Sequence, residues 1–531
     1  MLVSLAAFGC GEGGEATMPT GERYSSIVGA DQAVQYSVEV QAAKGAIVSD
    51  AMNADDAEPP STEEYDRIVE NAFKFSKREP LSTFSIDVDT ASYANVRRFL
   101  MQNRKPPPGA VRIEEMINYF NYDYPQPSDE HPFAVHVEMG PCPWNDQHQV
   151  ARIGLKGREL DGRPAANLVF LLDVSGSMSA QNKLPLVKSA IRMLTSQMNG
   201  DDRIAIVVYA GSAGLVLPST SGDNKGAILN AIERLNAGGS TNGGEGIQLA
   251  YDTAVANFID NGINRVILAT DGDFNVGTTD RSSLVKLIES QAKSNVFLSV
   301  LGFGNGNYKD ATMENLADRG NGNYAYIDRE REAHKVLVEQ MAGTLVTIAR
   351  DVKIQVDFNP AQVSGYRLIG YENRMLNAED FRDDAKDAGE IGAGHTVTAL
   401  YEIVPNGAVV PAGDVEPSKY QTEPELKDKS STDELLTVRL RYKQPDVDDT
   451  TEFHIPFDQS PHSELSETSN DFRFAAAVAA FGMTLRDSEY RGAITMDDIK
   501  ALANSGIGSD REGWRREFCD LLNRAETVAA R

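Results

Sequence analysis

The segment Asn167-Leu-Val-Phe-Leu-Leu-Asp-Val-Ser-Gly-Ser-Met-Ser179 sets the architecture expected for the whole chain. Its apolar run, 168–172, is typical of a strand buried on both faces of a sheet. The run leads into Asp173, Ser175 and Ser177, three short oxygen-bearing side chains at alternate positions. A carboxylate and two hydroxyls at the carboxyl end of a central parallel strand predict half of a site for a hard cation.

The region around this segment alternates regularly between strand and helix patterns. Strands are expected at 167–173, 203–209, 265–270, 296–303 and 324–327, and helices at 184–198, 225–235, 246–258, 281–293, 310–318 and 330–348. Such alternation predicts right-handed crossovers and an α/β fold with a doubly wound, mostly parallel, Rossmann-like sheet. Ligand sites in these sheets lie at the carboxyl ends of the strands, which is where Asp173 falls.

Two later segments supply the other half of the predicted site. The glycine-rich segment 238–244 contains Thr241, and Asp271 directly follows the expected strand 265–270. Glycines allow a backbone to approach a ligand closely. Two carboxylates and three hydroxyls form an oxygen-only donor set, which favours Mg²⁺, Mn²⁺ or Ca²⁺ over Zn²⁺ or Cu²⁺. Fewer than six strong protein ligands leave water on the cation, and a partner carboxylate could displace that water.

This combination of Asp173, Ser175, Ser177, Thr241 and Asp271 resembles the metal-ion-dependent adhesion site (MIDAS) of von Willebrand factor type A domains. All five positions match, in order and at fitting separations. The resemblance implies that the hydroxyls bind the cation directly and that the aspartates act directly or through water. It also implies a divalent cation, with Mg²⁺ favoured and Mn²⁺ and Ca²⁺ as alternatives, and a protein ligand that presents an acidic side chain.

The flanking sequences extend the resemblance. Segments 82–97 and 471–483 are similar to the modules that flank the type A domain in a group of bacterial envelope proteins, the von Willebrand factor type A lipoproteins. We therefore expect an α+β N-terminal module at 80–160, the type A domain at 161–349, and a β-rich and helical C-terminal domain at 350–531. Upstream, 26–79 is expected to be an acidic flexible linker and 1–25 to contain a lipoprotein signal remnant and the start of this spacer.

The N-terminal segment suggests how the protein is attached to a membrane. Its first nine residues are apolar or small and lead directly to Cys10, which resembles a lipobox whose cysteine becomes lipidated. The segment is short and lacks a preceding basic residue, so an ordinary disordered terminus remains the alternative. No later stretch approaches the ~18–20 uncharged apolar residues of a membrane helix. The expected location is the bacterial cell envelope, as a periplasmic or outer-membrane lipoprotein.

Composition excludes several classes of function. The 531 residues carry a formal net charge of −27, whereas nucleic-acid binding requires a basic footprint. The three cysteines show no CxxC pair, which argues against a zinc cluster or a disulfide framework.

Asp87 and Asp89 resemble a cation or phosphotransfer motif, but no glycine turn or distal carboxylate follows. We interpret them as structural residues that cap the next helix.

Three functions compete on this basis. The leading hypothesis is a metal-dependent, adhesion-type protein-binding module with no catalytic residues, hence not an enzyme. A metal-assisted hydrolase is the second, with Asp273 as a candidate base, but no histidine, lysine or second metal cluster lies close in sequence. The third is a subunit that partners an AAA+ ATPase, as in chelatase-like or MoxR-like systems. Export of a lipidated Cys10 would exclude a cytoplasmic ATPase as the partner.

Overall fold

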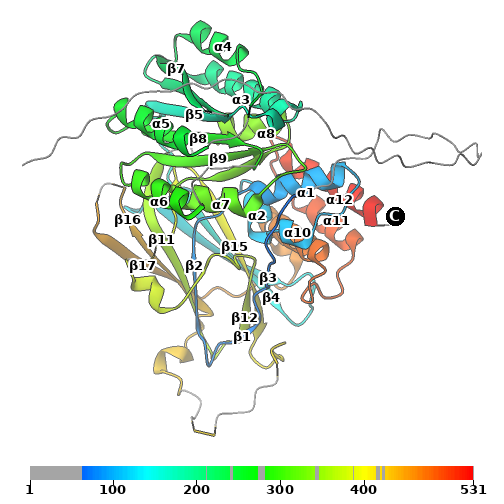
Figure 1. Cartoon of the computed structure of the whole chain (residues 1–531). Helices are drawn as coiled ribbons and strands as arrows, with labels where there is room; N and C mark the ends of the chain where they lie inside the picture. Colours follow the sequence, from blue (N-terminus) through cyan, green and yellow to red (C-terminus); the bar gives the residue numbers. More distant parts are fainter. Residues whose placement is uncertain are drawn as a thin grey trace, which may run out of the picture. The chain divides into compact units, whose positions relative to one another are not determined.

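A computed structural model describes the chain over residues 62–210, 212–239, 243–272, 281–340, 346–384, 386, 388–413, 419–420, 425–445 and 447–529. Three β-sheets and their helices make up this part of the chain (Figure 1). The N-terminal segment with Cys10, most of the expected linker, Thr241 and Asp273 lie outside the described residues.

The first sheet has the strand order β10-β9-β8-β5-β6-β7. Its parallel strands are β5 (Ala166–Asp173), β6 (Arg203–Tyr209), β8 (Ile263–Thr270), β9 (Phe297–Phe303) and β10 (Tyr324–Ile327). This confirms the predicted doubly wound, mostly parallel sheet. The edge strand β7 (Ala213–Ser221) runs antiparallel to β6 and was not predicted. It contains Gly214 and Pro218 and is only partly buried, so it lacks the apolar pattern of a central strand.

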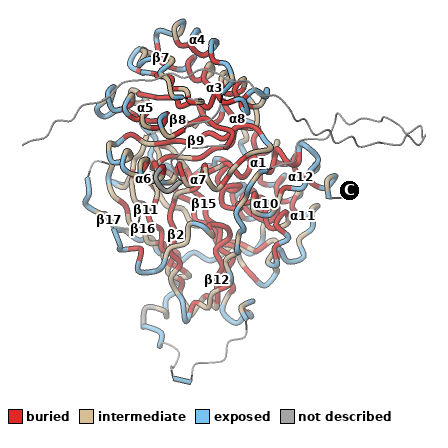
Figure 2. The backbone as a smooth tube through the Cα atoms, viewed as in Figure 1, coloured by how far each residue is buried: buried red, intermediate tan, exposed pale blue. Residues whose placement is uncertain are grey.

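Helices cover both faces of this sheet, because β5 buries alternate side chains in opposite directions. Leu168, Phe170 and Leu172 join the core formed with α3 (Leu184–Gln197), α4 (Lys225–Glu233) and α8 (Glu330–His334). Val169 and Leu171 join the core on the other face, formed with α5 (Gly243–Ala256), α6 (Arg281–Ala292) and α7 (Asp310–Arg319). All eight residues of β5 are buried, as expected for a strand at the centre of such a fold (Figure 2).

Two antiparallel sheets form the second part of the molecule. One has the order β1-β12-β15-β4-β3, and the other has the order β13-β2-β11-β16-β17 with β14 paired to β11. The strands before the parallel sheet are β1 (Lys74–Phe75), β2 (Leu81–Ser85), β3 (Phe133–Pro141) and β4 (Gln149–Gly157). Those after it are β11 (Thr347–Phe358), β12 (Val363–Ile369), β13 (Met375–Leu376), β14 (Ile391–Gly392), β15 (Thr396–Pro405), β16 (Leu436–Lys443) and β17 (Thr450–Phe457).

Each antiparallel sheet combines strands from both flanks of the parallel-sheet domain. Phe84 of β2 pairs with Ile354 of β11, and Gly154 of β4 pairs with Thr398 of β15. The inner faces of the two sheets share one apolar core, which makes them a sandwich. The expected division into a separate N-terminal module (80–160) and C-terminal domain (350–531) is therefore corrected, because the two flanks fold together.

The helices of the two flanks also pack on one another. They are α1 (Ala91–Met101), α2 (Ile113–Asn118), α10 (Asn470–Arg486), α11 (Met496–Ser505) and α12 (Trp514–Ala529). Side chains from all five share one core, and Figure 1 shows the blue and red ends of the described chain side by side. The alanine-rich run 475–480 within α10 is fully buried there. None of the described helices is both long and apolar enough to cross a membrane.

The helix predicted over 330–348 does not reach its expected end. Helix α8 ends at His334, a π-helical segment follows over Lys335–Glu339, and Thr347 already begins β11. The boundary placed between residues 349 and 350 therefore falls inside a strand. Helix α8 is held against the flanking helices, because buried Arg97 of α1 pairs with Asp328 and Glu332 at 2.5 and 2.7 Å.

Candidate metal centre

The polar side chains that follow β5 lie at the carboxyl edge of the parallel sheet. Asp173 is fully buried, and its Oδ1 accepts a hydrogen bond from the backbone N–H of Ser175 at 2.8 Å. The hydroxyls of Ser175 and Ser177 lie 3.0 Å apart, with Ser175 buried and Ser177 exposed. The loop thus presents two adjacent hydroxyls beside a carboxylate, with one of them open to solvent.

The register of the parallel strands places two further polar groups on Asp173. Asp173 is level with Tyr209 at the end of β6, and Thr270 ends β8 on the other side of β5. The hydroxyls of Tyr209 and Thr270 each donate to Asp173 Oδ2, both at 3.3 Å. These bonds hold the carboxylate in place. Sequence reasoning missed both residues, although their positions as the last residues of neighbouring strands could have indicated them.

Asp271, directly after β8, is also fully buried and faces the same loop. Ser177 hydrogen-bonds its carboxylate, which brings the two segments of the predicted site together. The ammonium of Lys183 donates to Asp271 Oδ2 at 2.8 Å, so the expectation that no lysine lies close to the site is wrong. Burial opposes ionisation of Asp271, but the hydrogen bonds from Lys183 and Asn307 outweigh it and hold the pKa of this carboxyl below its ordinary value.

The glycine-rich segment also approaches this edge of the sheet. The N–H of Gly238 donates to Val174 O at 2.7 Å, and the N–H of Gly176 donates to Gly239 O at 3.3 Å. The chain just before Thr241 is therefore fastened to the Asp173 loop, whereas Thr241 itself lies outside the described residues. We call Asp173, Ser175, Ser177 and Asp271 the strand-end site.

One glycine is required by the turn that carries Asp271. Gly272 has φ +96°, and a Cβ there would lie 2.5 Å from the backbone nitrogen of Lys309. Only glycine meets both conditions without displacing the neighbouring loop. The Thr-Asp-Gly sequence is thus explained locally, as a strand end followed by a tight, crowded turn.

The residues of the strand-end site fit a hard divalent cation. Its donors are carboxylate and hydroxyl oxygens, the set that Mg²⁺, Mn²⁺ and Ca²⁺ use. Burial raises the pKa of Asp173 above its ordinary value, and the nearby Asp271 carboxylate acts in the same direction while hydrogen bonds from Ser175 oppose it. Two buried carboxylates that disfavour each other's ionisation would gain from a shared cation.

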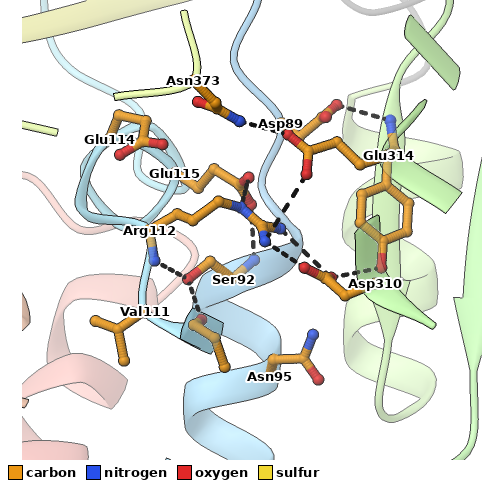
Figure 3. A network of polar contacts seen from close by, with 12 residues as sticks. Asp89, Ser92, Asn95, Val111, Arg112, Glu114, Glu115, Asp310, Glu314 and Asn373 are labelled. Carbon is orange, nitrogen blue, oxygen red and sulfur yellow. Dashed lines mark hydrogen bonds and ion pairs between the residues drawn. The ribbon is translucent and has the colours of Figure 1, made fainter. Parts of the chain in front are cut away.

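A second group of carboxylates lies where the parallel-sheet domain meets the sandwich. Asp89, Glu115 and Glu314 offer oxygens that all lie within 4.8 Å of one another. Arg112 pairs with Glu115 and Asp310 (Figure 3). We call this group the junction cluster, and its full membership is Asp87, Asp89, Glu115, Asp310, Glu314 and Asp318 with Arg112 and Arg374.

The contacts of the junction cluster make it a structural fastening. Arg374 contacts Asp89 and Glu314 at 3.5 and 3.2 Å, and Asn373 donates to Glu314 at 2.7 Å. Asp89 also accepts the backbone N–H of Tyr324 at 2.7 Å. The predicted capping role of Asp87 and Asp89 is wrong, since α1 begins without a side-chain cap. Both residues instead pair with Arg374, 285 positions from Asp89.

Comparisons with known proteins agree with this architecture. The protein-family model of the von Willebrand factor type A domain matches residues 167–340. A second family model, described as von Willebrand factor, matches residues 59–152, and a third, described as uncharacterized protein YfbK, C-terminal, matches residues 343–528. The class of protein is therefore a von Willebrand factor type A protein, and the type A domain is a protein-interaction, adhesion-type module.

The particular family follows from one relative. The chain is 44% identical over 478 residues to the uncharacterized protein YfbK of Escherichia coli (strain K12), covering 88% of this chain and 82% of the relative. The chain belongs to the YfbK family of type A domain proteins. It is also 33% identical over 200 residues to the uncharacterized protein sll0103 of Synechocystis sp., covering 37% of this chain and 46% of that one.

Among solved structures, a von Willebrand factor type A protein from Catenulispora acidiphila is similar with a TM-score of 0.38. Its sequence identity is 18%, and the match covers 73% of this chain and 90% of that chain.

Proposed function

We propose that the protein binds a protein partner through a divalent cation held at the strand-end site. Asp173, Ser175, Ser177 and Asp271, together with Thr241, would hold the cation, with Mg²⁺ favoured. The cation would supply a positive charge and an open coordination position, which an acidic side chain of the partner fills. The observation that carries this proposal is the convergence of two buried carboxylates and two adjacent hydroxyls, one of them solvent-exposed, at one sheet edge.

Binding explains this arrangement better than catalysis does. The hydroxyls of Tyr209 and Thr270 fix Asp173 as an acceptor, and Lys183 pairs with Asp271. Both carboxylates are thus positioned by neighbouring side chains, as a cation ligand would need to be. The hydrolase hypothesis rested on Asp273 as its base, and this residue lies outside the described residues.

The test is capture of envelope proteins by the full chain in the presence of Mg²⁺. We expect the wild type to capture partner proteins in Mg²⁺ and to release them when EDTA is added. Asp173→Asn should fail to capture the same proteins. Glu115→Gln is the matched control, because it changes a buried carboxylate of the junction cluster and leaves the strand-end site intact. Identical sets of captured proteins under all conditions would contradict the proposal.

We also propose that the protein acts at the bacterial cell envelope, anchored through a lipid on Cys10. Support comes from the sequence alone, where an apolar run ends at this cysteine. Palmitate labelling of wild type and Cys10→Ala tests it. We expect label in the wild type only, and equal labelling or none in both would contradict the anchor and reopen the AAA+ ATPase alternative.

A further inference from the structure

A lysine side chain already supplies positive charge at the strand-end site. Lys183 lies just before α3, and its side chain is 8% exposed. Its ammonium donates to Asp271 Oδ2 at 2.8 Å and to Asn307 Oδ1 at 3.0 Å. Asp271 is one of the two carboxylates that would hold the cation, so the lysine contacts the group that the cation needs.

The fold contains a built path for this side chain. Gly304, just after β9, has φ +78°, and a Cβ at this position would lie 2.3 Å from Lys183 Cε and 2.6 Å from its Cγ. The glycine therefore leaves the space through which the aliphatic part of Lys183 passes. The carbonyl of Gly304 accepts a hydrogen bond from the hydroxyl of buried Tyr326 at 2.5 Å, and this bond holds the backbone of Gly304 in place. Lys183 is thus held by two acceptors and a fitted wall, unlike a lysine on a solvated surface.

We propose that Lys183 is a tethered internal cation that balances Asp271 in the metal-free site and makes the metal-loaded site select an anionic partner group. This inference rests on the proposed function, because it concerns the same site. It assigns a specificity-determining role to a residue outside the five positions of the predicted site.

The balance of charges gives the physical reason. Asp173 and Asp271 with one ammonium leave the metal-free site with one net negative charge. A divalent cation turns this into one net positive charge, which a single carboxylate from the partner neutralises. Without Lys183, the loaded site would already be neutral and would attract a carboxylate less.

The same lysine repels the entering cation and competes for Asp271, so it should weaken binding of the bare metal by roughly tenfold or more.

The experiment measures Mn²⁺ binding to the full chain by electron paramagnetic resonance, with and without acetate as the carboxylate probe. Lys183→Met removes the charge and keeps most of the apolar stem. Lys188→Met is the matched control, since Lys188 lies on α3, the helix that Lys183 precedes, and its ammonium contacts only the carbonyl of Glu233 among the hydrogen bonds described for it. We expect Lys183→Met to bind Mn²⁺ about tenfold more tightly than wild type, and acetate to strengthen Mn²⁺ binding in wild type but not in this variant.

A second variant keeps the test decisive if Lys183→Met folds poorly, and a second measurement checks Lys183→Met if it folds. Asn307→Ala removes one acceptor of the ammonium and retains the ion pair, so Mn²⁺ affinity should rise by a smaller factor. Mn²⁺ should also raise the melting temperature of Lys183→Met more than that of wild type, because it replaces a lost counter-charge.

Each outcome separates the two proposals. Equal Mn²⁺ affinity in wild type and Lys183→Met, with equal acetate effects, would overturn the role of Lys183 and leave the cation site standing. Weaker binding in Lys183→Met would overturn it as well, since the lysine would then support the site. Absence of Mn²⁺ binding in both proteins would overturn the cation site itself, and with it this inference.

Discussion

The strand-end site and the junction cluster both bury carboxylates, and they differ in how the negative charge is balanced. At the junction, Arg112 and Arg374 bring planar guanidinium groups that engage several carboxylates each, between two parts of the fold. At the strand ends, one lysine contacts one of two carboxylates, and the hydroxyl of Ser177 faces solvent.

This difference separates a structural group from a binding site. Arginine forms bidentate, permanently charged pairs that suit fixed contacts, whereas a lysine ammonium is a compact charge on a flexible stem. The junction carboxylates have their partners within the fold. Of the two strand-end carboxylates, Asp271 contacts the ammonium of Lys183, and the exposed Ser177 lies in the loop beside them. A count of acidic residues alone would favour the junction cluster over the strand-end site as the binding site.

The largest expected effect tests the structural role of the junction. Arg112→Met would leave Glu115 and Asp310 buried without their guanidinium, and we expect the free energy of unfolding to fall by about 3–5 kcal/mol. Urea denaturation measures this loss, and Mn²⁺ affinity should stay unchanged.

Arg192→Met is the control for that loss. Arg192 pairs with Glu233 on the surface, where both side chains are at least 38% exposed, and such pairs contribute about 1 kcal/mol or less. Equal stability of the two variants would contradict a structural role for Arg112.

The second prediction concerns pH. Burial raises the pKa of Glu314 to about 7, with Glu115 adding to the effect and Arg112 opposing it. The folded chain therefore holds a proton more tightly than the unfolded chain, so the stabilising contribution is present below about pH 4.5 and is lost as pH rises to about 7. The loss should be at most about 3 kcal/mol.

Glu314→Gln should flatten this part of the stability curve, because glutamine stays neutral throughout. Chemical denaturation at pH 5 and at pH 7 measures the slope. Glu289→Gln is the control, because Glu289 is exposed and pairs with Arg319 on the surface. This variant should keep the pH slope of stability that the wild type has. If the stability of Glu314→Gln still falls between pH 5 and pH 7 as steeply as that of wild type, Glu314 is not the group that causes the loss.

The smallest expected effect concerns the exposed hydroxyl of the strand-end site. Water can replace a neutral, solvent-facing ligand, so Ser177→Ala should weaken Mn²⁺ binding only about tenfold, or about 1.4 kcal/mol. Ser179→Ala, in the same loop and also exposed, is the control. Calorimetric titration of both variants decides the point, and an unchanged affinity in Ser177→Ala would exclude this hydroxyl from the cation's ligands.

Sequence alone could predict the parts of the site that depend on local pattern. Asp173 and Asp271 each end an apolar run, and parallel strands bring such ends to one edge, so their proximity follows from topology. Lys183 could not be found in this way. Its contact with Asp271 spans 88 positions and depends on a glycine after a third strand, and no local pattern encodes that geometry.

The flanking architecture was missed for a related reason. Strands were expected in both flanks, and Phe84 and Ile354 lie in strands there, but a strand pattern does not name its pairing partner. The pairing of these residues joins segments 270 positions apart across the whole type A domain. The junction cluster has the same character, because Arg374 and Asp89 lie 285 positions apart in the sequence.

The most direct test of the cation site is Mn²⁺ binding to the full chain in four forms: wild type, Asp173→Asn, Asp271→Asn and Glu115→Gln. The account predicts that both strand-end variants lose more than the ~10–100-fold in affinity that removal of an outer partner of a metal site costs, while Glu115→Gln binds as wild type does. Retained binding in the strand-end variants would contradict the account, and binding lost only in Glu115→Gln would place the cation at the junction.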